Sequence, residues 1–152
     1  MKKNLISIFF CCLIGLSLSF YMFKQYDKKE IPASITVETL DFLQIGVYSS
    51  KETMEENVKN VNYYIYTEEN NQFHVFVAIT KEENFEKVKG YYESLGYDIY
   101  KKEISVSNQS FLEILNQYEM MLKEITDTST IGTIESQVLS KYEELVINEQ
   151  NQ

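Results

Sequence analysis

The side chains best suited to binding chemistry in this 152-residue chain are Gln44, Tyr48, His74 and Phe76. They occur at alternate positions of two expected strands, so the spacing predicts that all four lie on one face of a sheet. Aromatic rings cover the apolar sides of sugars, and amide or imidazole groups bond their polar edges, so this set suits saccharide recognition. Two plainer interpretations stay open. In the first, Tyr48 and Phe76 form a cross-strand pair that only stabilises the sheet. In the second, helices near the carboxy terminus cover this face.

Catalytic and metal chemistry find little support in the sequence. His74 is the only histidine, and Cys11 and Cys12 both fall in an apolar segment near the amino terminus. The rest of the chain therefore lacks a thiol nucleophile and the ligands of a typical zinc site. The carboxylates of Glu68 and Glu69 are adjacent in a polar turn and lack the opposed spacing of a glycosidase pair. No G-x-S-x-G or P-loop motif occurs, and we expect no catalytic activity, no metal and no cofactor.

The charge of the chain argues against nucleic acid as a partner. The sequence has 14 Lys, no Arg and 23 acidic residues. Five of the lysines precede residue 31, so residues 31–152 carry nine Lys against 21 acidic residues, a net charge of −12. Such a body does not easily form the basic track that displaces counterions from phosphates. We therefore expect no binding to nucleic acid.

An apolar segment at residues 5–23 predicts a transmembrane helix. Its 19 residues carry no charge, and at about 1.5 Å per residue the helix matches the thickness of the hydrocarbon core. Its end at Phe20–Phe23 lacks the small residues of a signal cleavage site. Lys2 and Lys3 favour a cytoplasmic amino terminus. We expect a single-pass protein of the cell membrane, with a linker at residues 24–40 and an extracytoplasmic domain.

Residues 41–106 alternate between strand and helix patterns. Capping boxes are expected at Ser49–Glu52 and Thr80–Glu83, offset by 31 residues, and Gly96 is a helix stop. The expected elements are a strand at 42–48, a helix at 50–61, a hairpin of strands at 62–67 and 73–79, a helix from the second box to residue 95, and a strand opening at residue 97. This order predicts an α+β fold, a β-α-β-β-α-β split sandwich of the ferredoxin or RNP type. Both helices would cover one face of a four-stranded antiparallel sheet and leave the other face open.

Residues 107–152 are expected to be a helical extension. Apolar residues follow a 4-3-4-3 spacing from Phe111 to Ile125 and again, nearly, from Ile131 to Leu145. The pattern predicts two helices with a break at 127–130. They could pack on each other as a hairpin, extend the domain, or present a seam to a protein partner.

The segment Phe42–Glu52, FLQIGVYSSKE, resembles the opening of a SPOR domain, the sporulation-related repeat. The resemblance covers residues 41–106 and extends to His74–Ala78 and Leu95–Tyr97, although Ala78 stands where a Gly is common in the family. It implies the split-sandwich fold and, as ligand, peptidoglycan glycan strands stripped of stem peptides, held on the open sheet face. The positions that match are Gln44, Gly46, Tyr48 and Ser49. His74 and Phe76 join them on periodicity alone.

We therefore expect a membrane-anchored protein that binds peptidoglycan and localises to sites of cell-wall remodelling, at division or sporulation. The alternative is a non-catalytic scaffold of a membrane complex, in which the sheet has lost glycan affinity and the acidic domain or the terminal helices dock a protein partner. An exposed groove at Gln44, Tyr48 and Phe76 would favour peptidoglycan binding. Burial of this sheet face under residues 110–147 would favour the scaffold function. A third interpretation, a small-molecule sensor, has no specific residue in its favour.

Overall fold

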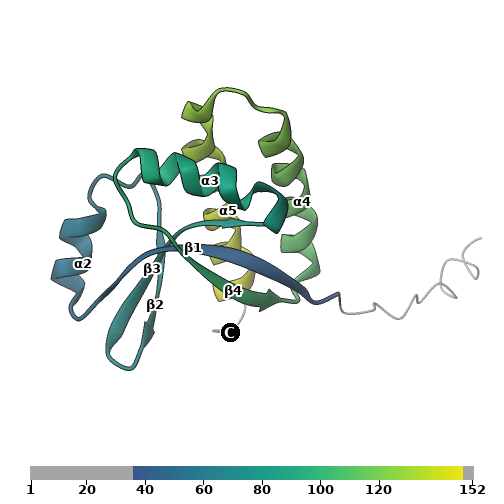
Figure 1. Cartoon of the computed structure of the whole chain (residues 1–152). Helices are drawn as coiled ribbons and strands as arrows, with labels where there is room; N and C mark the ends of the chain where they lie inside the picture. Colours follow the sequence, from purple (N-terminus) through teal and green to yellow (C-terminus); the bar gives the residue numbers. More distant parts are fainter. Residues whose placement is uncertain (1–35, 149–152) are drawn as a thin grey trace, which may run out of the picture. The chain divides into compact units, whose positions relative to one another are not determined.

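Figure 1 shows the computed structural model, which describes residues 36–148. The predicted transmembrane helix at residues 5–23 and most of the linker lie outside the described residues. Between residues 36 and 148, no helix combines the length and the hydropathy needed to cross a bilayer.

Four strands form one antiparallel sheet, as the sequence predicts. The order across the sheet is β2-β3-β1-β4. The strands are β1 (Glu38–Tyr48), β2 (Ile65–Glu69), β3 (Gln72–Thr80) and β4 (Tyr100–Val106). The central strands β1 and β3 are buried over long stretches, which explains their nearly continuous apolar sequence.

Helices surround this sheet. Two of them interrupt the strands, α2 (Lys51–Val58) and α3 (Glu82–Ser94). Two follow the last strand, α4 (Gln109–Glu124) and α5 (Ile131–Tyr142), with a 3₁₀ turn at Thr128–Thr130 between them and a π-helical segment at Glu143–Ile147 after them. The two terminal helices and the break between them agree with the prediction.

Local sequence signals explain several ends of these elements. The side chain of Ser50 accepts a hydrogen bond from the Thr53 amide at 3.2 Å and begins α2, one residue later than the expected box. Asn70 and Asn71 have φ of 53° and 58°, the left-handed conformation that a two-residue hairpin turn requires. Gly96, at φ 91°, ends α3.

The second predicted capping box is wrong. Lys81, not Thr80, is the residue that precedes α3, and no side chain caps the helix there. The Thr80 hydroxyl instead donates to the Glu119 carboxylate of α4 at 2.7 Å. A tertiary contact has therefore taken the hydroxyl that the local pattern assigned to the cap.

The bounds of three strands also differ from the prediction. Strand β2 spans Ile65–Glu69 rather than residues 62–67. Strand β1 begins at Glu38, so residues 38–40 of the expected linker belong to the sheet, where they pair with residues 104–106. Strand β4 begins at Tyr100 rather than at residue 97. Residues 97–99 instead follow the glycine turn that ends α3.

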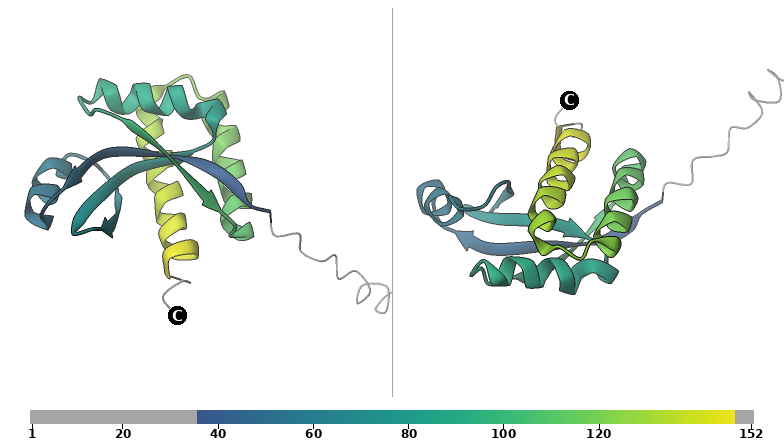
Figure 2. Two further views of the ribbon diagram at one scale, coloured as in Figure 1. Left: turned by 60° about the horizontal axis from the view of Figure 1, so that its bottom comes forward. Right: turned by 90° about the horizontal axis from the view of Figure 1, so that it is seen from above.

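The expectation of an open sheet face is wrong. In the right-hand view of Figure 2, α3 lies on one side of the sheet, and α4 and α5 lie on the other. On that second side, Phe42 packs edge-to-face against Phe76 at 5.6 Å and against Tyr142 of α5 at 5.2 Å between ring centroids. Phe111 of α4 also packs edge-to-face against Tyr142, at 5.1 Å between ring centroids. Phe76, which alternation assigned to an exposed surface, is therefore part of the core beneath the α4–α5 hairpin.

We predict that Phe76→Ala lowers the free energy of unfolding by about 3–5 kcal/mol, because it removes a fully buried ring that packs against Phe42. Tyr142→Phe, which keeps the ring, should change stability little, because its hydroxyl has no hydrogen-bond partner among the described residues. Denaturant titration of both variants measures this. A Phe76→Ala protein as stable as the wild type would contradict the burial of this face.

Candidate functional site

The structure keeps part of the predicted sugar-binding set together. The Gln44 Oε1 and His74 Nδ1 atoms lie 3.3 Å apart, and both side chains are half-buried. Phe76 lies on the same face but is only 1% exposed. Gln44 and His74 can therefore meet a ligand, whereas Phe76 cannot.

Tyr48 lies on the opposite face of the sheet from this pair. Gln44 pairs with Phe76 and Val47 with His74, so Gln44 and Val47 share a face, and Tyr48 is turned the other way. The cause is a pair of register shifts between Leu43 and Gly46, which break the strict alternation on which the prediction depended.

Tyr48 has a structural setting of its own. Its ring folds back over Gly46, where a Cβ would come within 2.7 Å of the Tyr48 hydroxyl oxygen. Partial burial, with a smaller contribution from Tyr97, raises the pKa of the Tyr48 hydroxyl. Ser49 is exposed at the turn that follows. The structure thus explains Gly46 and Tyr48 as a packing pair.

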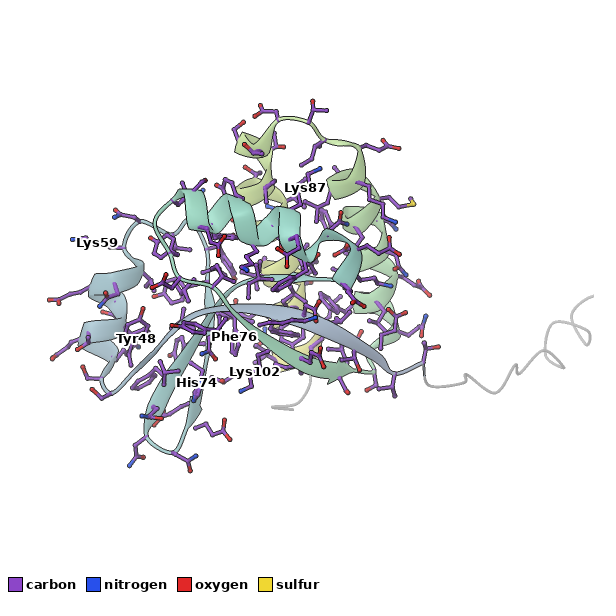
Figure 3. All side chains as sticks on the ribbon, viewed as in Figure 1. Tyr48, Lys59, His74, Phe76, Lys87 and Lys102 are labelled. Atoms are coloured by element: carbon purple, nitrogen blue, oxygen red, sulfur yellow. The ribbon has the colours of Figure 1, made fainter. Side chains whose placement is uncertain are left out.

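Part of the predicted face stays accessible, and we call it the uncovered strip: Gln44, Val47, His74, Tyr100 and Lys102. Tyr100 pairs with Gln44 across β1 and β4 and is 60% exposed. The Lys102 ammonium lies 5.8 Å from the Phe76 ring centroid and 3.9 Å from a carboxylate oxygen of Glu69. Figure 3 shows His74 and Lys102 near Phe76, with Tyr48 apart from them.

Two buried carboxylates that were not predicted from the sequence hold the α4–α5 hairpin to the sheet. Glu119 of α4 is 5% exposed and accepts hydrogen bonds from the Thr80 hydroxyl at 2.7 Å and the Lys81 amide at 2.8 Å. Its other oxygen accepts a hydrogen bond from the side-chain amide of Asn84 at 2.6 Å. These charge-assisted bonds join α4 to the end of β3 and the start of α3.

Glu135 of α5 is fully buried and accepts a hydrogen bond from the backbone of β3. One of its oxygens accepts a hydrogen bond from the Ile79 amide at 3.1 Å, and the other has no partner in the described part of the chain. Strand β2 pairs with β3 only as far as Phe76, so the outer edge of β3 is unpaired beyond that residue. The two carboxylates thus supply acceptors where a neighbouring strand is missing.

Burial also changes the ionisation of Glu135. Loss of solvation raises the pKa of its carboxyl well above the usual value, the Ile79 amide opposes this in part, and the nearby Glu119 adds to the rise. The helical pattern of the sequence could have indicated that Glu135 is buried, because it falls between the apolar residues Ile134 and Val138 on the buried side of α5.

Between residues 36 and 148, no three His, Asp or Glu side chains converge in a way that could hold a metal. Glu119 and Glu135 are the closest to a catalytic pair in type, but protein atoms enclose both. Their observed contacts join α4 and α5 to β3 and α3.

We predict that Glu135→Gln makes stability less dependent on pH. The raised pKa means that the folded protein holds this proton more tightly than the unfolded chain, so wild-type stability falls as the pH rises above about 4.3, until the folded pKa is passed. The neutral amide keeps an acceptor for the Ile79 amide, so the variant should gain stability relative to the wild type as the pH is raised. Thermal unfolding at several pH values measures this, and parallel profiles would refute it.

Glu135→Ala is the matched control. It leaves the Ile79 amide without an acceptor in a buried place, which costs about 1–3 kcal/mol, and it leaves a cavity as well. It should therefore be destabilised over the pH range in which Glu135→Gln is not.

No protein-family model matches the chain, and no curated protein or solved structure is significantly similar to it.

Proposed function

We propose that this protein is a non-catalytic interaction protein of a membrane complex, held at the membrane by residues 5–23, and that its folded domain docks a protein partner through α4. The observation that carries the proposal is the burial of Phe76 and Phe42, each 1% exposed, beneath the α4–α5 hairpin. A sheet that bound a glycan strand along its open face would need these aromatic rings at the surface. Here Phe42 already packs against both Phe76 and Tyr142.

The outer side of α4 offers a surface for a partner. Met120 and Met121 are 64% and 51% exposed, although the inner side of the same helix is fully buried. With Gln117, Lys123 and Glu124 they border a shallow depression. Methionine side chains are flexible and polarisable, so a pair of them suits an adaptable protein contact.

The acidic character of the domain favours a basic partner. Residues 31–152 carry a net charge of −12, and exposed acidic residues flank the methionines on α4, among them Glu113 and Glu124. Complementary charge would speed the encounter, and salt would slow it.

Peptidoglycan binding is the second candidate. One observation favours it: on the uncovered strip, the exposed ring of Tyr100 lies opposite Gln44, and Gln44 is bonded to His74. The resemblance to SPOR domains points to the same ligand and, with it, to localisation at division or sporulation sites. On this hypothesis the glycan would contact a narrower footprint that excludes Phe76 and Tyr48.

We predict that the full-length protein does not co-sediment with peptidoglycan sacculi, whether intact or stripped of stem peptides by an amidase. The matched variant is Gln44→Ala/His74→Ala, which alters the uncovered strip without touching the core stack. If the wild type pellets with stripped sacculi and this variant does not, the glycan-binding function replaces the one proposed.

A second prediction concerns α4. A photo-crosslinking residue at Met121 should trap a discrete protein partner in cells, and Met120→Asp in the same chain should abolish the product, because a charge disrupts an apolar contact. The control position is Glu86, an exposed residue of α3. Equal products from both positions, or none from Met121, would contradict docking through α4.

A further inference from the structure

A small cavity opens between the loop after α2, the second half of α3 and the start of α5. Its volume is about 180 Å³, below that of pockets for drug-sized ligands and adequate for a single ring. The loop leaves α2 at Lys59, which is labelled in Figure 3. None of the lining residues belongs to the uncovered strip or to α4.

Tyrosine rings form the walls of this cavity, and contacts around it hold three of them in place. The Tyr63 hydroxyl donates to the Glu143 carboxylate. Tyr91 packs edge-to-face on Tyr92 at 5.0 Å between ring centroids. Its hydroxyl lies close to Gly132 of α5, in space that the side chain of any other residue would fill. The Tyr92 hydroxyl is in turn bonded to the Val77 carbonyl at 2.8 Å. The cavity is therefore built before any ligand arrives, which lowers the entropy cost of binding.

Several polar groups at the cavity are not used by the fold. The side chains of Asn60, Asn62 and Tyr97 and the hydroxyl of Tyr91 make no hydrogen bond within the described part of the chain. The Ser136 hydroxyl donates to the Gly132 carbonyl at 2.6 Å, so its oxygen can still accept. No charged side chain lines the cavity. Donors and acceptors thus surround an aromatic hollow without any ion to attract a charged ligand.

We propose that this cavity is a binding site for one neutral pyranose ring. The apolar faces of such a ring would lie against Tyr63 and Tyr91, and its hydroxyl or acetamido groups would bond to Asn60, Asn62 and Tyr97. A phosphorylated sugar or a nucleotide would find no cation in the lining. A quaternary ammonium ion, which aromatic residues also attract, would leave both asparagine amides without a partner.

This inference goes beyond docking through α4 and does not depend on it. It assigns a role to residues of the loop after α2, of α3 and of α5 that have no other assigned function. It also supplies the specific residues that a small-molecule sensor would need. The site also differs from a glycan footprint on the uncovered strip, so variants can separate the two.

The test is a titration of the full-length protein with N-acetylglucosamine and with glucose, followed by ligand-observed NMR, in a detergent without a sugar headgroup. For a ligand of this size we expect a dissociation constant of roughly 1 mM. Asn60→Ala/Asn62→Ala should weaken binding about tenfold or more, and Tyr97→Phe should weaken it by a smaller factor. The asparagines are exposed and unbonded, so the double variant should unfold at the wild-type temperature.

Two control variants and two charged probes decide the outcome. Asn116→Ala, at an exposed position of α4, and Gln44→Ala/His74→Ala should both bind the sugars as the wild type does. Glucose 6-phosphate and choline should bind more weakly than the neutral sugars. The proposal is overturned if neither neutral sugar binds at roughly 100 mM, if the pocket variants bind unchanged, or if a charged probe binds as tightly.

Discussion

The unpaired edge of β3 is the constraint on which the rest of the structure depends. Strand β2 is short and pairs with β3 only as far as Phe76, which leaves the Ile79 and Lys81 amides on the side where a further strand would lie. A buried amide without an acceptor costs as much as a lost hydrogen bond or more. Glu135 and Glu119 supply those acceptors, each from a different helix of the α4–α5 hairpin. The hairpin is thus a replacement for strand pairing as well as a cover for the sheet.

Anchoring at that edge also decides which face is covered. Once Glu119 and Glu135 hold the two helices beside β3, Tyr142 of α5 lies over Phe42, and Phe111 of α4 completes the aromatic stack. The rings that a glycan-binding sheet would present to solvent become core. At the end of the face near Gln44, His74 and Tyr100, the side chains remain half-buried or exposed.

The sequence predicted the order of the elements well because each had a local signal of the right period. The hairpin turn at Asn70–Asn71 and the helix stop at Gly96 needed no tertiary information. The errors share one origin, which is contact between distant segments. The local pattern predicts Thr80 as a helix cap, but its hydroxyl donates to Glu119 of α4 instead. Strict alternation predicts that Gln44 and Tyr48 share a face, but the register shifts between Leu43 and Gly46 place them on opposite faces. No pattern within the strand reveals either event, and the signal for the buried acids was their place within the apolar stripes of α4 and α5.

The docked hairpin is also a requirement for both proposed sites. Helix α5 contributes Gly132 and Ser136 to the tyrosine-walled cavity, and α4 turns Met120 and Met121 outward only because its other side is fixed on the sheet. A sugar in the cavity would bridge α5 to α3 and to the loop after α2, and so would favour the docked arrangement. A partner that binds the outer side of docked α4 favours the same state. Two ligands that stabilise one conformation raise each other's affinity by linkage, even when they never touch. The size of that coupling is limited by how often the hairpin undocks on its own, which the contacts of Glu119 and Glu135 control.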